Sequence, residues 1–307
     1  MPLVESDQFL SRVVLGTVQW GMDYGISNQR GMPSDEELGA MLAEAYQHGV
    51  RTLDTARAYG QSEKRIGALL DGSPGWRVIT KLSPDLGKYG EEPDDIVKAA
   101  AESLAESHAN LNRPCLDGVL LHRAVQLRLA GGAVWQYLLA QQDAGVIRQL
   151  GVSAMTLEEA LLALDEPGVR LIQVASSLFD QRLVQLGFFK RAKEQGVEVF
   201  IRSIFLQGVA FMHVSELPEF LEPLARPLAS IRSWAEAREL TVGEALVRYI
   251  AGHGAQLVVG CENQEQLSAL LQAAGKGAFD AEKMQELEQL VPLLPDAVLD
   301  PWRWQTR

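Results

Sequence analysis

The stretch RTLDTARAYGQSEKRIG, residues 51–67, joins a strand pattern to a helical pattern through a short polar loop. The run at 51–55 predicts a strand that carries Asp54 at its end. Tyr59 follows five residues later, and a helical pattern begins near residue 62. A strand, a loop with polar side chains and a helix form one βα unit, the repeating element of parallel α/β folds.

Working outward from this unit, the chain repeats it along its whole length. Most of the strand candidates are apolar on both faces, which is expected when one face meets a core and the other is covered by helices. These runs lie at 12–17, 51–55, 77–81, 116–122, 148–153, 170–175, 197–202 and 256–260. Helical patterns fill the gaps near 34–49, 62–70, 93–111, 130–144, 156–164, 182–195, 229–252 and 263–273.

Eight such units with right-handed crossovers predict an α/β fold, a single (β/α)8 TIM barrel domain over residues 1–307. A capping box of Ser34 and Glu37 starts the helix at 34–49, and Gly49 ends it. The competing prediction is an open, doubly wound sheet. Such a sheet usually carries GxGxxG after its first strand, and LGTVQWG at 15–21 does not match that pattern.

Composition limits the partners and the compartment. The 307 residues are 47% hydrophobic and 22% charged with a net charge of −12, which argues against a broad nucleic-acid or anionic-membrane surface. The two cysteines, Cys115 and Cys261, form no CxxC motif, so a reducing compartment is expected. The chain starts without a signal-peptide pattern and has no run of 18 apolar residues, so we expect a cytoplasmic protein without membrane contact.

The carboxyl ends of the predicted strands are polar although the strands are apolar. In barrel enzymes the active site lies at these ends. The sequence therefore predicts a polar site there, built from Thr17, Asp54, Lys81, His122, Ser153, Gln173, Arg202 or Ser203, and Gly260.

Four of the groups near these ends suit carbonyl reduction. A carboxylate (Asp54), a phenol (Tyr59), an ammonium (Lys81) and an imidazole (His122) are the acid–base groups that a carbonyl reductase needs beside a nicotinamide. The other histidines show no metal-ligand spacing, and no zinc motif, P-loop or GxSxG is present, so no metal site is predicted.

These residues lie in motifs that resemble the aldo-keto reductase family, from about residue 12 to 275. The first connection, residues 19–33, resembles a bacterial subgroup of that family, NAD(P)H-dependent oxidoreductases often found beside sugar or polysaccharide genes. The motifs that carry the resemblance are RTLDTARAYGQSEKRIG (51–67), ITK (79–81), LLH (120–122), GVS (151–153), IQV (172–174), VVG (258–260) and QEQL (264–267).

The resemblance implies a role for each of the four groups. Tyr59 is expected to donate its phenolic proton to the carbonyl oxygen as hydride arrives from the nicotinamide. Lys81 favours the phenolate because an ammonium stabilises a neighbouring negative charge. Asp54 is expected to pair with Lys81, and His122 to hydrogen-bond and orient the carbonyl oxygen.

The resemblance also implies a cofactor, NADP(H) or NAD(H). Loop 203–210 is expected to cover its pyrophosphate and residues 260–267 to hold its adenosine end, where backbone N–H groups at the start of a helix suit an anion. The expected cofactor contacts are Gly16, Thr17, Val18, Ser153, Gln173, Arg202, Ser203, Gly208, Gly260, Glu262 and Gln266.

Three residues depart from the family pattern. Ala154 stands where an asparagine often contacts the carboxamide. Arg202 stands where an aromatic ring commonly stacks on the nicotinamide; a guanidinium can stack there but repels the oxidised ring, so we hypothesise a bias toward reduced cofactor. Glu262 stands where NADPH-selective relatives usually carry Ser, Thr, Lys or Arg, and its carboxylate favours NADH. The family pattern favours NADPH, so both cofactors stay open.

The expected function is reduction of an aldehyde or ketone of a small molecule, with sugar-like carbonyl compounds among the candidates. Two alternatives stay open: a non-catalytic cofactor-binding barrel, and a barrel lyase or isomerase that uses no nicotinamide. Aromatic and apolar side chains are expected to form the substrate pocket. The candidates are Trp20, Tyr24 and Phe205, with Phe211, Met212 and Trp302 or Trp304 as further walls.

Overall fold

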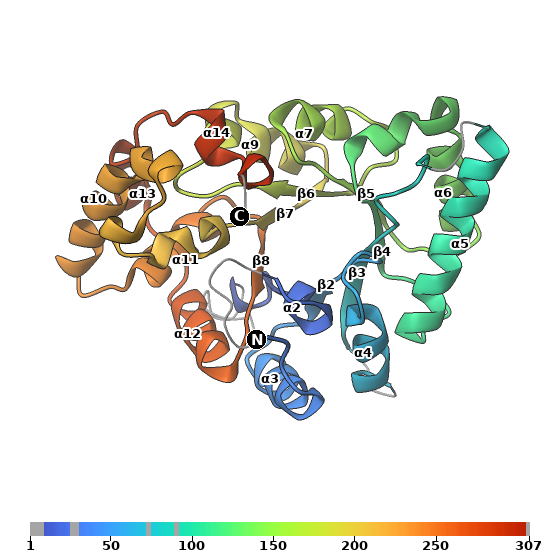
Figure 1. Cartoon of the computed structure of the whole chain (residues 1–307), viewed down its shortest axis with the longest axis horizontal. Helices are drawn as coiled ribbons and strands as arrows, with labels where there is room; N and C mark the ends of the chain where they lie inside the picture. Colours follow the sequence, from blue (N-terminus) through green and yellow to red (C-terminus); the bar gives the residue numbers. More distant parts are fainter. Residues whose placement is uncertain (1–8, 25–30, 72–74, 89–91, 305–307) are drawn as a thin grey trace.

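The computed structural model describes residues 9–24, 31–71, 75–88 and 92–304. Eight parallel strands form a closed barrel in chain order, and β8 pairs with β1 (Figure 1). This confirms the predicted (β/α)8 barrel, and the open-sheet alternative is wrong. The strands are β1 (Val13–Gly16), β2 (Thr52–Asp54), β3 (Arg77–Lys81), β4 (Gly118–Leu121), β5 (Leu150–Ser153), β6 (Leu171–Ala175), β7 (Glu198–Arg202) and β8 (Gln256–Gly260).

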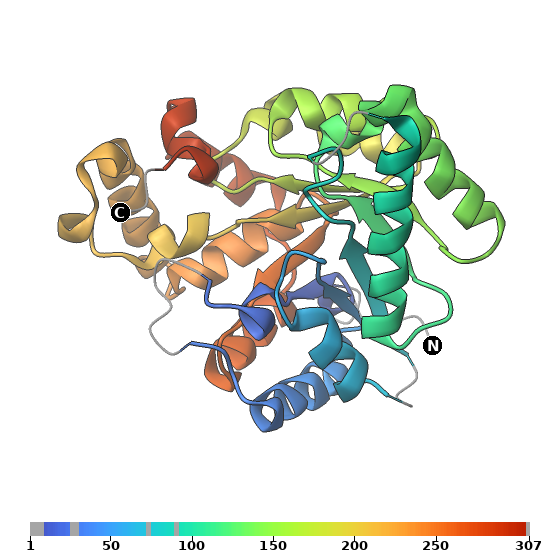
Figure 2. The ribbon, with the colours of Figure 1, turned by 45° about the vertical axis from the view of Figure 1, so that its right-hand side comes forward.

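A ring of helices surrounds the strands, as Figure 1 shows. The α-helices are α2 (Val18–Gly21), α3 (Asp35–Gln47), α4 (Ser62–Leu69), α5 (Pro93–Leu111), α6 (Ala133–Asp143), α7 (Leu157–Leu164), α8 (Arg182–Gln185), α9 (Phe188–Glu194), α10 (Ala225–Glu236), α11 (Val242–Ala251), α12 (Gln264–Gly275), α13 (Ala281–Gln289) and α14 (Asp296–Leu299). Short 3₁₀ segments are η1 (Ala124–Gly132), η2 (Leu206–Phe211), η3 (Val214–Glu216), η4 (Glu219–Leu224) and η5 (Pro301–Arg303). Figure 2 shows the tail with α14 beside the segment that precedes α10.

Local sequence signals explain several helix ends. The predicted capping box is present at α3, where Ser34 accepts from the Glu37 N–H and the Glu37 carboxylate accepts from the Ser34 N–H. Two predicted helices are each broken into two. The helix expected at 182–195 breaks at Gly187, which has φ 65°, and the helix expected at 229–252 breaks before the Thr241 cap of α11, where Glu239 has φ 56°. These left-handed residues end a helix because they cannot continue its hydrogen-bond ladder.

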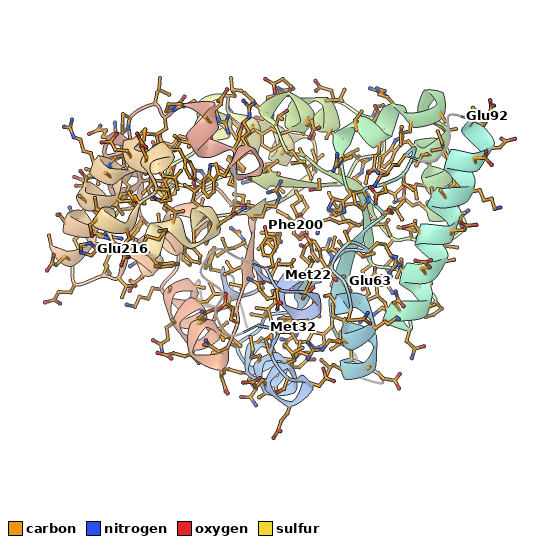
Figure 3. The ribbon with its side chains drawn as sticks, viewed as in Figure 1. Met22, Met32, Glu63, Glu92, Phe200 and Glu216 are labelled. Carbon is orange, nitrogen blue, oxygen red and sulfur yellow. The ribbon has the colours of Figure 1, made fainter. Side chains whose placement is uncertain are left out.

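Two residue layers inside the barrel determine where the site lies. A separate cluster of buried apolar side chains fills the barrel: Val14, Ile79, Leu120, Leu171, Phe200 and Val258. Figure 3 shows Phe200 in the middle of the ring of strands. Because side chains alternate along a strand, residues two positions further on share the inward face. That next layer is Gly16, Lys81, His122, Gln173, Arg202 and Gly260, so the predicted site residues lie over the apolar core.

The opposite end of the barrel is closed by an ion pair. Arg77 at the start of β3 donates to both carboxylate oxygens of Glu198 at the start of β7, at 2.9 and 2.7 Å. A cavity of about 750 Å³ lies beside this end, and its two other arginines, Arg113 and Arg148, pair with Asp117. None of the four acid–base groups lines this cavity, so its size does not make it the active site.

In the described segments, no helix is both long and apolar enough to cross a membrane.

Candidate active site

A buried ion pair joins the ends of β2 and β3. The Lys81 Nζ lies 2.7 and 2.8 Å from the two carboxylate oxygens of Asp54 and donates to the Thr55 carbonyl at 2.9 Å. Only 1% of the Lys81 side chain and 5% of the Asp54 side chain are exposed. Burial opposes the charged ammonium, but attraction to Asp54 and Tyr59 outweighs it and raises the pKa of Lys81. Lys81 is therefore charged at neutral pH.

Tyr59 reaches this ammonium from the loop between β2 and α4. Its hydroxyl lies 3.4 Å from the Lys81 Nζ. A close backbone contact holds the loop: Gln61 N–H donates to the Gly21 carbonyl at 3.1 Å, and a Cβ added at Gly21 would lie 1.8 Å from the Tyr59 carbonyl oxygen. Gly60 has φ 55°, a conformation that favours glycine. Glycines at 21 and 60 thus allow the approach that places the phenol.

His122 lies one residue beyond β4, so the strand predicted at 116–122 is shorter than expected. Its imidazole faces the Tyr59 ring edge-on, with ring centroids 6.3 Å apart. Burial is the main cause that lowers the pKa of His122 from 6.5 to about 4, and the charges of Lys81, Arg123 and Arg202 act in the same direction. The imidazole is therefore neutral at physiological pH. The structure thus brings all four predicted acid–base residues together.

Glu63, the second residue of α4, lies in the 51–67 stretch but was not among the predicted site residues. Its carboxylate is 2% exposed and lies beside β3 (Figure 3). It accepts hydrogen bonds from Thr80 at 2.6 Å, Ser107 at 2.8 Å, Arg57 at 2.7 Å and Asn110 at 3.2 Å. Four donors compensate the burial of this charge. The available signal was Thr80, a polar residue on the helix-facing side of β3.

Two of the expected cofactor contacts lie side by side on neighbouring strands, each with a polar atom that has no hydrogen bond within the described residues. Ser153 and Gln173 are in register on β5 and β6 and are 4% and 1% exposed. The Gln173 amide nitrogen donates to Asp54 at 2.8 Å. The Ser153 hydroxyl and the Gln173 amide oxygen make no hydrogen bond within the described part of the chain. A donor–acceptor pair of this kind fits a carboxamide such as that of nicotinamide.

The loop after β7 has an unusual backbone. Ser203, Leu206, Gln207 and Gly208 all have positive φ, between 48° and 93°. Three of them are not glycine, and such residues cost on the order of 1–3 kcal/mol each when surrounding structure holds them there. Strain of this kind concentrates at ligand sites, and successive backbone N–H groups in such loops can bind anions. The expectation that residues 203–210 cover a pyrophosphate stays a prediction.

At the ends of β1 and β8, several expected cofactor contacts are already engaged within the protein. The Thr17 hydroxyl donates to the Asp54 carbonyl at 2.9 Å and accepts from Ser62 at 2.7 Å, so it braces β1 against β2. Gly16 pairs with Gly260, where an added Cβ would lie 2.4 Å from the Gln19 amide oxygen. Val18 begins α2.

The adenosine-end candidates lie at the start of α12. The N-cap is Asn263, whose side chain accepts from Gln266 N–H at 2.9 Å, so Glu262 is not the cap. The Gln266 amide oxygen in turn accepts from Glu262 N–H at 2.9 Å. The Gln266 amide oxygen is therefore already engaged within the protein, and contact of Glu262 with an adenosine ribose stays a prediction.

Two of the family departures touch each other. The Arg202 guanidinium at the end of β7 donates to the Ala154 carbonyl at 3.2 Å. Ala154 directly follows β5 and is 2% exposed. Arg202 and Ala154 thus form one local arrangement rather than two separate substitutions.

The expected pocket walls are not all at the barrel mouth. Trp20 is 1% exposed and belongs to the main hydrophobic core, which favours a packing role. Tyr24 lines a cavity with Arg202, and Phe205 packs on Phe211 with centroids 4.9 Å apart. Met212 packs against the core and Trp304 is 7% exposed, while the Trp302 side chain is outside the described part.

The fold and this cluster define a barrel with buried acid–base groups at the strand carboxyl ends, the arrangement of barrel enzymes. A sequence model of the Aldo/keto reductase family matches residues 12–292. The chain belongs to this family of oxidoreductases.

Individual relatives are distant. D-threo-aldose 1-dehydrogenase from Pseudomonas sp is 30% identical over 168 residues, 46% of this chain and 51% of that protein. Methylglyoxal reductase DkgA from Salmonella typhimurium is 29% identical over 136 residues, 44% of this chain and 47% of that protein. The chain spans about half the length of these curated relatives.

Solved structures share the fold. The aldo-keto reductase AKR11C1 from Bacillus halodurans, in its holo form, has a TM-score of 0.72 at 21% identity and covers 92% of both chains. An aldo/keto reductase from Klebsiella pneumoniae in complex with NADP and acetate has a TM-score of 0.68 at 20% identity, covering 92% of this chain and 91% of that one.

Proposed function

We propose that this protein reduces the aldehyde or ketone group of a small molecule to an alcohol, with NADPH or NADH as hydride donor. The observation that carries the proposal is the Lys81 ammonium, which lies between the Asp54 carboxylate and the Tyr59 hydroxyl. A phenol beside a fixed, buried cation is suited to release a proton because the cation stabilises the phenolate that remains.

The two groups nearest to the reacting carbonyl take different roles. His122 is neutral at physiological pH, so it is not the acid and instead donates a neutral hydrogen bond that orients the carbonyl oxygen. Tyr59 donates the proton, and Lys81 stabilises the negative charge left on its oxygen. Asp54 keeps Lys81 charged and in place, and Gln173 holds Asp54 from the cofactor side.

The same layer suits a nicotinamide cofactor, which when bound supplies the hydride. Ser153 and Gln173 would hold its carboxamide, and the loop at 203–208 its pyrophosphate. NADPH is favoured by the relatives crystallised with NADP or NADPH, and NADH by the Glu262 carboxylate, which repels a 2′-phosphate. Sugar-like substrates are supported by the name of one relative, D-threo-aldose 1-dehydrogenase. A cytoplasmic location remains part of the proposal.

The test has two arms. Tryptophan fluorescence quenching with NADPH and, separately, NADH measures whether either cofactor binds and which binds tighter. Reduction of a panel of aldoses and small aldehydes is then followed by loss of cofactor absorbance in the wild type and Tyr59→Phe. We expect tight binding in both proteins and turnover only in the wild type. Binding without wild-type turnover would indicate a non-catalytic cofactor-binding barrel; no binding by the folded protein would favour a lyase or isomerase.

A further inference from the structure

One arginine on α4 ties together the two ends of the connection between β1 and α3. The Arg65 Nη1 donates to the Trp20 carbonyl in α2 at 2.6 Å, and the Nη2 donates to the Pro33 carbonyl just before α3 at 2.6 Å. The Nε donates to the Asp35 carboxylate at 2.6 Å. Figure 1 shows α4 beside both α2 and α3. All three nitrogens of one guanidinium are thus engaged with this connection.

The two carbonyl contacts of Arg65 matter more than its ion pair. A guanidinium is a planar, rigid fork, so its N–H groups hold two acceptors in a fixed relation. The last carbonyls of a helix lack partners within the helix, and the arginine supplies one to Trp20. The Arg65 side chain is 17% exposed, whereas the Asp35 side chain is 71% exposed. A pair with so exposed a carboxylate contributes about 0–1 kcal/mol, so the carbonyl contacts fix the connection.

The near end of this connection lies against the loop that carries Tyr59. A Cβ added at Gly60, the residue after Tyr59, would lie 2.2 Å from the Gly21 carbonyl oxygen and 3.6 Å from the Met22 Cβ. Gly21 and Met22 directly follow Trp20, whose carbonyl the guanidinium holds. The held backbone therefore leads straight into the part of the connection that lies beside the proposed proton donor.

The connection presents exposed side chains at this place. Met22 and Tyr24 are both exposed to solvent. In the view of Figure 3, Met22 lies between Phe200 in the barrel and Met32 near the far end of the connection. Substrate sites are lined mainly by apolar and aromatic side chains. Met22 and Tyr24 are therefore suited to contact the part of a substrate that extends beyond its carbonyl group.

The loop that carries Tyr59 has anchors that do not involve this guanidinium. The Gln61 N–H donates to the Gly21 carbonyl at 3.1 Å, and the Ser62 hydroxyl donates to the Thr17 hydroxyl at 2.7 Å. These bonds hold the start of α4 against α2 by themselves. Loss of the guanidinium should therefore loosen the connection beyond Gly21, while the phenol of Tyr59 keeps its place.

We propose that Arg65 is a positioning residue for the substrate: it fixes Met22 and Tyr24 as one wall of the substrate pocket. Arg65 thereby governs the binding of carbonyl compounds that are large enough to reach this wall. The inference rests on the proposed reductase function and assigns the residue that shapes its substrate side. A wall that is already in place strengthens binding, because the substrate does not have to order it on arrival.

The experiment measures kcat and KM separately for a short substrate, propanal, and for two larger ones, benzaldehyde and D-xylose. Cofactor Kd is measured by tryptophan fluorescence. The variants are Arg65→Gln, Arg65→Lys and Met22→Ala. Asp35→Asn is one control, because it leaves both carbonyl contacts in place. Arg51→Gln is the matched control, because Arg51 also donates to two backbone carbonyls, at 2.6 and 2.8 Å, but at the start of β2, at the opposite end of the barrel.

We expect Arg65→Gln to raise KM for the two larger substrates about tenfold, which corresponds to ~1.4 kcal/mol of binding. Its kcat, its cofactor Kd and its KM for propanal should stay within about threefold of the wild type, the scale of peripheral contacts. Arg65→Lys should recover part of the loss, because an ammonium can reach one of the two carbonyls. Met22→Ala should raise the same two KM values. Asp35→Asn and Arg51→Gln should keep the wild-type KM values.

Other results overturn the inference. A lower kcat with unchanged KM in Arg65→Gln, equal for short and large substrates, would show that the residue only stabilises the fold. Equal KM changes in Arg51→Gln would lead to the same conclusion. Wild-type KM values in Met22→Ala would remove the wall, and this result decides the matter even if Arg65→Gln does not fold. A wild type that binds cofactor but reduces no carbonyl compound would refute the proposed function, and this inference with it.

Discussion

The carboxylate of Glu63 accepts a 2.6 Å hydrogen bond from the hydroxyl of Thr80, the residue immediately before Lys81. The same carboxylate accepts from Arg57, whose own N–H donates to the Lys81 carbonyl at 3.0 Å. One buried side chain on α4 therefore fixes both the strand that carries the ammonium and the loop that carries Tyr59. Glu63 acts as a positioning residue, because it touches neither Tyr59 nor the Lys81 ammonium.

Replacing the Glu63 carboxylate by an amide is expected to loosen the placement of the Tyr59 loop relative to β3, which carries Lys81. In Glu63→Gln, Arg57 loses a buried charged partner and the free energy of unfolding falls by about 1–3 kcal/mol. We expect kcat to fall about tenfold with little change in cofactor Kd. Glu106→Gln is the control, because Glu106 also pairs with Arg57 but its side chain is 60% exposed and should contribute about 0–1 kcal/mol. If Glu63→Gln and Glu106→Gln change kcat and stability equally, Glu63 has no positioning role.

The Asp54–Lys81 pair is expected to behave as a unit. Asp54→Asn leaves the buried ammonium without its counter-charge, so turnover should fall on the order of 10²- to 10⁴-fold and stability should fall too. The double variant Asp54→Asn/Lys81→Met removes the unpaired buried ammonium and should be more stable than Asp54→Asn, though inactive. Urea denaturation of the wild type, both single variants and the double variant measures the coupling. Additive losses would mean that the two groups do not stabilise each other.

The neutrality of His122 predicts the pH behaviour. Its pKa is lowered from 6.5 to about 4, so protonation of the imidazole should not reduce kcat/KM between pH 8 and 5, and a loss should begin only as the pH nears 4. In the unfolded chain the same imidazole takes up a proton near pH 6.5. The unfolded state therefore binds more protons between pH 6.5 and 4, and stability falls as the pH is lowered through that range.

The measurement is the free energy of unfolding at pH 7.5, 5.5 and 4.5 for wild type and His122→Gln. The variant should lose less stability on acidification. Burial lowers the pKa of His253 to about 4 as well, so His253→Phe serves as a second comparison with the same direction and no effect on catalysis. A kcat/KM that drops near pH 6.5 and follows His122 would show that the imidazole titrates at its ordinary value.

The contact between Gly21 and the Tyr59 loop is expected to tolerate no side chain. A methyl group at position 21 would lie 1.8 Å from the Tyr59 carbonyl oxygen and 2.4 Å from the Ser62 nitrogen, so the loop must move. Misplacement of a reacting group by about 1 Å can cost on the order of 10²-fold, and we expect a loss of that size in kcat for Gly21→Ala.

Gly39→Ala is the matched glycine control. A Cβ there meets nothing within 4 Å in α3, so this variant should keep its activity and gain about 0.5–1 kcal/mol in stability. Full activity of Gly21→Ala, measured by steady-state kinetics beside this control, would show that the loop has another conformation that presents Tyr59.

The sequence by itself determined the barrel and the position of its polar end. Short apolar runs, helix caps such as Ser34 and polar residues at apolar strand ends are local signals, and they are strong because each depends on few neighbouring residues. Asp54, Lys81 and His122 were predictable in this way, as was Tyr59 from its motif.

Only the tertiary structure decided how side chains from distant segments share partners. The hydrogen bonds of Glu63 with Thr80 and Ser107, the contact of Arg202 with Ala154, and the pairing of Arg182 with Asp300 join residues from separate βα units. No periodicity encodes such contacts, because burial and charge compensation arise only when the barrel closes and brings its strand ends together.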